Sequence, residues 1–334
     1  MENGSGTSRV AVVTGATSGV GRAVALELAR NGYDVGLLAR SPDALAATER
    51  EISAAGARAV AVPTDVADEN AIEAAAVQAE ETLGPIDVWV NDAMTTIFAP
   101  FAEITPDEYR RATEVTYLGT VWGTRAALSR MVPRDRGNVI QVGSALAYRG
   151  IPLQAPYCGA KHAIKGFTES VITELLHEDS AVHVGMVDLP GVNTPQFDHC
   201  RSKMQRHPMP VPPIYQPEVA ARGVLNCLEK RRRQMYVGFP TIYTIWGNRI
   251  APWLLDRYLA RTAVKAQQTD QRVDSPRPGN LFAPVPGDPG ARGDFDGQAH
   301  ERSVQLWASE HRRLLAAATG AALGAAAVVS GVTR

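Results

Sequence analysis

A tyrosine and a lysine stand four residues apart in the stretch "YCGAK", residues 157–161. Residues at positions i and i+4 of a helix lie on one face, so Tyr157 and Lys161 would point the same way. An ammonium group beside a phenol favours the phenolate and lowers the phenol pKa from its ordinary value of about 10. The pair could then exchange a proton near neutral pH, although an ordinary amphipathic helix would also contain such a pair. The rest of the chain must decide between these interpretations.

A glycine-rich stretch, "TGATSGVG" over residues 14–21, lies between a β-branched apolar run and a segment with helical spacing. Gly15 permits a tight turn, Gly19 lets the backbone approach a ligand, and Gly21 allows close packing of helix on strand. The free N–H groups and positive dipole end of the helix favour a pyrophosphate. This setting predicts a dinucleotide site.

The second apolar run ends in "LLAR", which places Arg40 at the end of a predicted strand. A cofactor with a free ribose 2′-hydroxyl usually meets an acidic residue there. A guanidinium can instead bind a 2′-phosphate through two N–H donors, and Arg22 is a second candidate for this contact. A solvated cation at a strand end is the alternative. The sequence therefore favours NADP(H) over NAD(H).

Apolar runs and amphipathic segments alternate along the first 190 residues. We expect strands over 9–15, 34–40, 57–65, 86–92, 137–144 and 182–191, and helices over 21–32, 42–56, 69–84, 106–131 and 155–178. A further helix over 217–233 and a strand over 234–239 complete the pattern. Such strands indicate a parallel sheet covered on both faces. The predicted fold class is α/β, a Rossmann-type doubly wound parallel sheet of seven strands with a C-terminal extension.

The pattern changes after this catalytic domain, which we place at residues 8–240. Residues 241–266 are apolar and aromatic and would form a substrate-side extension. Residues 267–300 are rich in Pro, Gly and Asp and indicate an extended or disordered linker. Residues 301–334 would form a helical tail.

The composition excludes several classes of protein. A net charge of −1 over 334 residues argues against nucleic acid as a partner. The cysteines are too few and too scattered for a disulfide framework or a zinc site, and no other metal site is predicted. A polar N-terminus without a signal peptide and a reducing, cytoplasmic location fit best. The three cysteines are Cys158, Cys200 and Cys227.

Taken together, the motifs resemble those of the short-chain dehydrogenase/reductase family over roughly residues 8–240. They comprise Thr14-Gly15 with Gly19 and Gly21, Asp65-Val66, Asn91-Asp92-Ala93, Ser144, Tyr157 with Lys161, and Pro190-Gly191 with Thr194. The resemblance implies the strand order 3-2-1-4-5-6-7. It also implies a nicotinamide cofactor across the carboxyl ends of the strands.

The resemblance implies a catalytic set. Tyr157 would be the general acid/base, and Lys161 would hold the nicotinamide ribose and lower the Tyr157 pKa. Ser144 would hydrogen-bond the substrate oxygen. Thr116 stands where the family often has an asparagine that organises a water relay to the lysine. Its hydroxyl could hold a water less rigidly than an amide would.

The resemblance also implies the cofactor contacts. Asp65 and Val66 would bracket the adenine, and Asn91 would support the ribose and the fourth strand. Met94 departs from the family, which usually has glycine there; either the loop differs or Met94 lines the substrate side. The full predicted set is Gly15, Thr17, Ser18, Gly19, Gly21, Arg40, Asp65, Val66, Asn91, Tyr157, Lys161, Pro190, Gly191 and Thr194, the last three at the nicotinamide end.

The expected function is that of an NADP(H)-dependent oxidoreductase that interconverts a secondary alcohol and a ketone or aldehyde, on an apolar small molecule. The alternative is an NADP(H)-binding sensor or scaffold of the same fold with little turnover. The proline-rich segment after Thr194 would form an extended lid over the substrate. Helices over 106–131 and 155–177 would mediate homo-oligomers, as is common in the family.

The end of the chain has an uncharged run of Ala, Gly, Leu and Val over residues 314–329, preceded by Arg312 and Arg313. Gly320 and Gly324 form a pattern that lets helices approach closely in a bilayer. A membrane anchor, a helix packed on the domain and a disordered tail all remain open for this segment.

Overall fold

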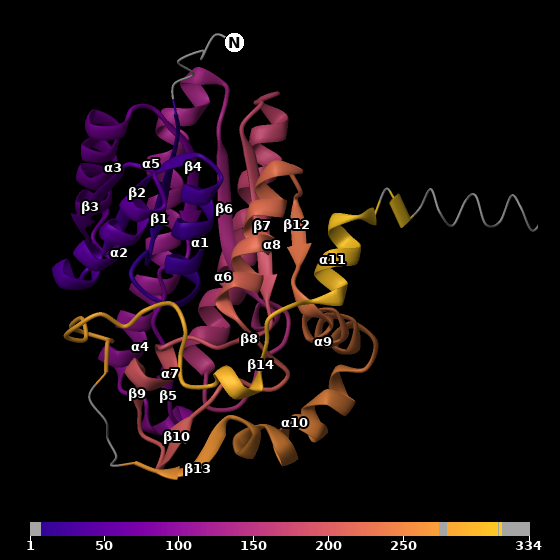
Figure 1. The fold of residues 1–334 in the computed structure, drawn as a ribbon. Coiled ribbons are helices and arrows are strands. Elements are labelled where there is room, and N and C mark those ends of the chain that lie inside the picture. Colours follow the sequence, from indigo (N-terminus) through magenta and orange to yellow (C-terminus); the bar gives the residue numbers. More distant parts are fainter. Residues whose placement is uncertain (1–7, 274–278, 313, 316–334) are drawn as a thin grey trace, which may run out of the picture.

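The computed structural model of the chain describes residues 8–273, 279–312, 314 and 315. Its centre is a sheet of seven parallel strands in the order β12-β7-β6-β4-β1-β2-β3 (Figure 1). This confirms the predicted fold class and strand order. The strands are β1 (Arg9–Thr14), β2 (Tyr33–Ala39), β3 (Ala59–Pro63), β4 (Ile86–Asn91), β6 (Asn138–Ser144), β7 (His183–Leu189) and β12 (Gln234–Tyr236).

Helices cover both faces of the sheet because its strands are apolar on both sides. One face buries a core with α1 (Gly19–Arg30), α2 (Pro42–Ala54) and α8 (Pro217–Glu229). The other face packs on α3 (Glu69–Leu83), α5 (Gly119–Met131) and α6 (Ala155–His177). Apart from α5, each of these helices matches a predicted segment to within a few residues.

The helix predicted over 106–131 is divided in two. It begins as α4 (Pro106–Thr113), where Thr105 and Glu108 form a capping box. A wider π-helical turn over Glu114–Leu118 then leads into α5. Such turns inside helices often lie at functional sites.

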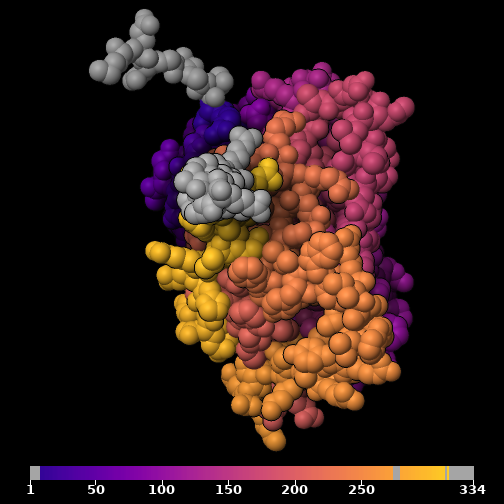
Figure 2. Space-filling view, turned by 90° about the vertical axis from the view of Figure 1, so that its right-hand side faces the viewer, coloured from indigo at the N-terminus to yellow at the C-terminus, as the bar shows by residue number. Residues whose placement is uncertain are grey.

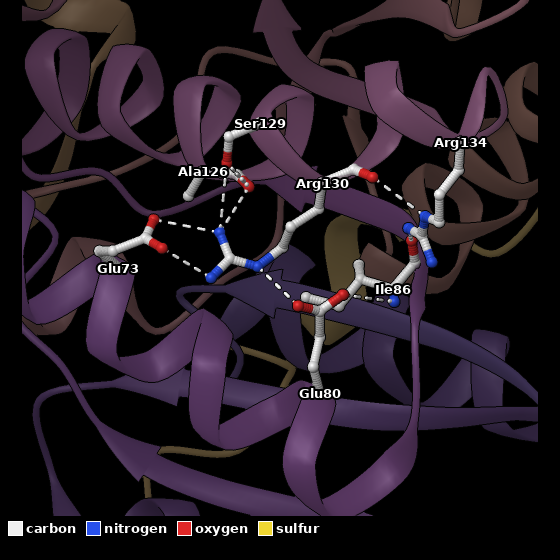
Figure 3. A network of polar contacts seen from close by, with 7 residues as sticks. All are labelled: Glu73, Glu80, Ile86, Ala126, Ser129, Arg130 and Arg134. Carbon is white, nitrogen blue, oxygen red and sulfur yellow. Dashed lines mark hydrogen bonds and ion pairs between the residues drawn. The ribbon is translucent and has the colours of Figure 1, made fainter.

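Ion pairs hold α3 against α5 (Figure 3). Arg130 of α5 bonds Glu73 at 2.7 Å and Glu80 at 2.8 Å, both on α3. Its Nη1 also donates to the carbonyl oxygen of Ala126, one turn back. Arg134 donates to the carbonyl of Ile86 and so connects the end of this helix to β4. These contacts fix the helix layer behind the sheet.

Short elements cover the carboxyl ends of the strands. The predicted lid contains only one short helix and otherwise short strands and coil, which confirms that it is extended. The elements here are β5 (Ile97–Phe98), β8 (Gly191–Val192), α7 (Gln196–His199), β9 (Arg201–Ser202), β10 (Arg206–Pro208), β11 (Ile214–Tyr215), β13 (Gln268–Arg272) and β14 (Ala299–His300). The remaining helices are α9 (Gly238–Ile250), α10 (Pro252–Ala266) and α11 (Val304–Glu310).

Residues 279–300, here named the strap, run back across this same end of the domain (Figure 1). The sequence predicts an extended or disordered linker here, whereas the strap is extended but fixed by contacts. Gly290 accepts a hydrogen bond from the N–H of Gly19 at 3.1 Å. Asp288 pairs with Arg22, and β14 pairs with β11. Proline and glycine disfavour regular structure, but they do not prevent a segment from packing against a domain.

Candidate active site

A cavity of about 500 Å³ lies at the carboxyl ends of the strands. Its inner wall contains the glycine stretch and the ends of β4, β6 and β7. Its outer wall is formed by the lid, α9, α10 and the strap. Most of the predicted site residues lie on this one surface. They are Gly15, Thr17, Ser18, Gly19, Arg40, Asp65, Val66, Ser144, Tyr157, Lys161, Pro190, Gly191 and Thr194.

Ser144, Tyr157 and Lys161 converge at the inner end of the cavity. Ser144 ends β6, and its side chain is hydrogen-bonded to the Tyr157 phenol. Lys161 lies one turn after Tyr157 on α6, with its Nζ 5.6 Å from the centre of the phenol ring. The shared face that the i, i+4 spacing predicts is therefore present.

Lys161 is buried and donates from Nζ to the carbonyl oxygen of Val142 at 2.6 Å. Burial lowers the pKa of Lys161 to about 8, although Asp92 and Asp188 act to raise it. Burial also raises the pKa of Tyr157, and the Ser144 hydrogen bond acts to lower it. The direction for Tyr157 is opposite to the one predicted from a neighbouring lysine. Desolvation of the phenolate outweighs a cation that is itself desolvated and held by a backbone carbonyl.

Two carboxyl groups accompany this lysine, the half-buried Asp92 and the fully buried Asp188. Burial raises the pKa of Asp92 to about 7, against the charge of Lys161 and a hydrogen bond from the N–H of Gly21. Burial likewise raises the pKa of Asp188 to about 7. Oδ2 of Asp188 accepts hydrogen bonds from Gln234 at 2.9 Å and from Tyr148 at 3.1 Å. Asp188 is thus a buried acid directly behind the catalytic set.

The structure assigns Thr116 a different role from the predicted one. Its hydroxyl donates to the carbonyl oxygen of Thr95 at 3.0 Å and accepts from the N–H of Thr95 at 3.1 Å. Its only proton is therefore committed, and the side chain is fully buried in the π-helical turn. Thr116 holds the loop that contains Met94, and its hydroxyl proton is not free for the predicted water relay.

The glycine stretch has the conformation that its sequence predicts. Gly19 has φ of +56°, a backbone conformation that other residues rarely adopt. Gly21 lies behind the loop, where a Cβ atom would come within 2.3 Å of the Gly15 carbonyl oxygen. The loop therefore presents bare backbone to the cavity at the start of α1, as a pyrophosphate site requires.

Arg40 lies at the end of the cavity nearest β2, where it meets the strap. It donates to the carbonyl oxygens of Asn280 and Leu281. Burial lowers its pKa, and the charge of Arg111 acts in the same direction while Asp65 opposes it. A guanidinium has five N–H donors, so three remain beyond these two contacts. Arg40 can therefore still fork onto a phosphate.

Asp65 and Val66, which are predicted to flank the adenine, also line the cavity. Burial acts to raise the pKa of Asp65, but hydrogen bonds from Arg111 and the N–H of Ala67 outweigh it and lower the pKa. Arg111 also donates to the Leu281 carbonyl of the strap at 3.2 Å. Sequence analysis missed Arg111, because the residue belongs to α4 and comes to this site only in the tertiary structure.

Two other residues predicted to contact the cofactor, Asn91 and Arg22, form contacts within the protein instead. The Asn91 amide bonds Gln141 at 2.9 Å and Thr124 at 3.1 Å, so it supports the fourth strand and points into the packed interior. Arg22 is 2% exposed and bonds Glu51 and Asp288. Its charge is taken up by two carboxylates, so it is not a second phosphate ligand.

The outer part of the cavity is more apolar. Met94 lines the cavity, and its predicted position on the substrate side stays a prediction. The lid contributes Phe197 and Met209, and the extension over 241–266 contributes Tyr243 and Leu259, among others. This side of the cavity is suited to a substrate with an apolar body.

Asp188 could have been noticed in the sequence as an acid inside an otherwise apolar strand, "VHVGMVDLPG". Within the described residues, no cluster of His, Cys, Asp and Glu is arranged to hold a metal ion. Likewise, no helix in the described part of the chain is both long and apolar enough to cross a membrane. The Ala/Gly run predicted as a candidate anchor lies almost entirely outside those residues.

Comparison with known proteins agrees with this geometry. The family model for short chain dehydrogenases matches residues 9–205. An uncharacterized oxidoreductase of Bacillus subtilis, YxnA, is 31% identical over 326 residues, which is 97% of this chain and 88% of that protein. A 3-dehydrosphinganine reductase of Danio rerio is 31% identical over 191 residues, but this match spans only 57% of its length.

Solved structures share the fold of this chain. A variant of actinorhodin polyketide ketoreductase with NADPH is 33% identical with a TM-score of 0.54, over 56% of this chain and 72% of that one. An alcohol dehydrogenase of Thermococcus sibiricus complexed with 5-hydroxy-NADP is 25% identical with a TM-score of 0.59. This match covers 69% of this chain and 95% of that one. The chain therefore belongs to the short-chain dehydrogenase/reductase family, the oxidoreductases that act on CH–OH groups.

Proposed function

We propose that the protein is an NADP(H)-dependent oxidoreductase that interconverts a secondary alcohol and a ketone, or an aldehyde and its alcohol, on an apolar substrate. The observation that carries this proposal is the convergence of Ser144, Tyr157 and Lys161 on a cavity that also contains the glycine stretch. A scaffold without turnover would have no need of this arrangement.

The residues of the cavity fit a bound dinucleotide. The glycine stretch and the start of α1 would hold the pyrophosphate, and Asp65 with Val66 would flank the adenine. Arg40 would bind a 2′-phosphate through its remaining N–H donors, which supports NADP(H) over NAD(H). When bound, the nicotinamide supplies or accepts a hydride.

The side chains at the inner end would handle the proton. In reduction, Tyr157 gives its phenolic proton to the substrate oxygen, and in oxidation it takes that proton back. Ser144 donates a hydrogen bond to the same oxygen as negative charge develops there. Lys161, with a pKa of about 8, is largely protonated at neutral pH and stabilises the phenolate that Tyr157 becomes.

The substrate class follows from the outer wall. Phe197, Met209, Tyr243 and Leu259 line the same cavity as Tyr157 and give it apolar and aromatic surface. The relatives include a 3-dehydrosphinganine reductase and an L-2,3-butanediol dehydrogenase. Because these two relatives act on very different compounds by name, they support a class of reaction and not a particular substrate. A homo-oligomer through residues 106–131 and 155–177 stays a prediction.

The test is to follow the absorbance of NADPH with a panel of apolar ketones and aldehydes. Tyr157→Phe should retain NADPH binding in a fluorescence titration and lose turnover by ~10²–10⁴-fold. Tyr109→Phe is the matched control, since Tyr109 lies on α4 and packs edge-on against Phe101. NADPH binding by the parent without oxidation across the panel would instead favour the sensor or scaffold.

A further inference from the structure

The two helices that border the outer cavity present an unusual number of large apolar side chains to solvent. On α9, Phe239, Tyr243, Trp246 and Ile250 are all more than half exposed and follow one another at helical spacing. Trp246 is 52% exposed and Ile250 is 77% exposed. These four residues form one stripe along the helix.

The next helix continues this surface. On α10, Trp253, Leu254 and Tyr258 are 60%, 53% and 59% exposed. The α10 side chains facing the protein are mainly Leu255, Leu259 and Ala263, four residues apart in turn. We name the exposed stripes of both helices the α9–α10 face. Figure 2 shows this part of the chain, in orange, over a large area of the molecule.

Polar contacts on the inner side of these helices fix them in place. Asn248 of α9 donates to the carbonyl of Tyr148 at 2.7 Å and accepts from Arg149 at 3.1 Å. Arg149 also pairs with Asp256 of α10 at 2.5 Å. The helices are therefore anchored to the loop after Ser144 by their inner side. The aromatic side chains on the opposite side of these helices are exposed to solvent even though the helices are attached to the domain.

The α9–α10 face is basic as well as aromatic. Arg249 and Arg257 lie over the rings of Trp246 and Trp253, at 5.4 Å and 5.6 Å from the ring centres. Arg261 and Lys265 are exposed on α10 as well. Asp256, the acidic residue of the two helices, is already paired with Arg149. The surface thus combines aromatic side chains with positive charge that forms no ion pair within the described residues.

This composition distinguishes between the partners that could cover the face. An isologous dimer brings the same patch of two copies together, so the arginines and the lysine would face their own equivalents. An anionic lipid surface instead attracts these cations, and tryptophan and tyrosine side chains suit the level of the lipid headgroups. Helices with aromatic and basic residues of this kind lie in the plane of such an interface.

The position of the face supports the same conclusion. Tyr243 and Tyr258 belong to the exposed stripes and also line the cavity. The cavity therefore borders the α9–α10 face. A molecule dissolved in the bilayer could enter here without crossing water, which an apolar compound would do only at a cost in free energy.

We propose that the α9–α10 face docks the protein on the surface of an anionic lipid bilayer. Tryptophan and tyrosine rings would enter the headgroup region, and the arginines would meet lipid phosphates. This peripheral contact needs no membrane-spanning helix. The entry route described above rests on the apolar substrate of the proposed function, but the test measures lipid binding alone, so either proposal can fail without the other.

The test is co-sedimentation of the full chain with vesicles of phosphatidylcholine, with and without phosphatidylserine. We expect binding to the anionic vesicles that weakens with salt. The double variant Trp246→Ser with Trp253→Ser should bind roughly tenfold more weakly. Arg257→Glu and Arg261→Glu should each reduce binding roughly fivefold. Fluorescence of the parent should be quenched by brominated lipid, and the double tryptophan variant should show much less quenching.

The control replaces equally exposed apolar residues elsewhere, Phe101→Ser with Leu176→Ser, which should bind like the parent. Phe101 is 70% exposed and Leu176 is 68% exposed. All variants keep the whole C-terminal segment, so binding through that segment would persist in the double tryptophan variant and overturn the proposal. Equal binding to both vesicle types would overturn it as well. So would a dimer in analytical ultracentrifugation that the tryptophan substitutions dissociate.

Discussion

The carbonyl oxygen of Gly290 accepts a hydrogen bond from the backbone N–H of Gly19 at 3.1 Å. Gly19 belongs to the turn that opens the dinucleotide site, and Gly290 belongs to the strap near the other end of the chain. Asp288 pairs with the buried Arg22 only two residues before this contact. The strap is thus bound directly to the glycine stretch and to the first helix, at the site predicted for the dinucleotide.

Asp288→Ala should therefore weaken both folding and cofactor binding. It leaves the buried Arg22 with one carboxylate in place of two, and the free energy of unfolding should fall by ~1–2 kcal/mol in urea denaturation. Fluorescence titration should show weaker NADPH binding, since the strap also forms part of the cavity wall. Asp294→Ala is the control on an exposed residue of the same strap. Equal behaviour of the two variants would mean that the pairing with Arg22 does not hold the strap.

Arg40→Asp should discriminate between the two nicotinamide cofactors. It removes the donors for a 2′-phosphate and adds repulsion, so the Kd for NADPH should rise by roughly 30–100-fold. The Kd for NADH should change far less, because NADH carries no such phosphate. Arg30→Asp, on the last turn of α1, controls for the change in net charge. A similar loss for both cofactors would indicate that Arg40 only holds the strap.

Asp188→Asn should change the pH dependence of stability. Burial raises the pKa of Asp188 from 3.8 to about 7, so folding favours its protonated form. That contribution to stability is fully present below pH 3.8 and is lost as the pH rises through 7. An asparagine stays neutral, so the stability of the variant relative to the parent should rise by roughly 3–4 kcal/mol between pH 4 and pH 8.

Urea denaturation at these two pH values measures that difference. Asp107→Asn is the control, because the Asp107 side chain is 79% exposed. A difference between Asp188→Asn and the parent that is the same at both pH values would show that Asp188 titrates as an ordinary carboxylate.

Thr116→Val should destabilise the loop that contains Met94. Valine has the shape of threonine but leaves the N–H and C=O of the buried Thr95 without their partner, at a cost of ~1–3 kcal/mol. Thr116→Ser keeps the hydroxyl and should restore most of the stability. Thermal unfolding compares the three proteins. A valine variant as stable as the parent would show that these two hydrogen bonds contribute nothing.

Much of the fold was predictable because its signals are local. The apolar runs and helical spacing determined the seven strands and the helices between them, and the strand order followed from the family resemblance. The i, i+4 spacing of Tyr157 and Lys161 and the glycine stretch likewise depend on neighbouring residues alone. Each of these features matches the structure.

Other features were decided only by the tertiary structure. The helix over 106–131 is interrupted by a π-helical turn, in which Thr116 binds the backbone of Thr95 in a different element. The pKa direction of Tyr157 depends on burial, which the i, i+4 spacing does not reveal. The charge of Asp188 on β7 acts to raise the pKa of Lys161 on α6, and the sequence does not show that these two residues lie close together.

The strap and the α9–α10 face are the clearest features that the sequence alone does not predict. A sequence rich in proline and glycine indicates extended backbone, but whether that backbone packs depends on distant partners such as Arg22 and Gly19. The apolar stretch after residue 240 predicts a substrate-side extension, but the sequence does not reveal that its helices leave most of their aromatic side chains exposed. Local pattern determines which elements form, and the contacts between distant elements determine what those elements cover and what they leave exposed.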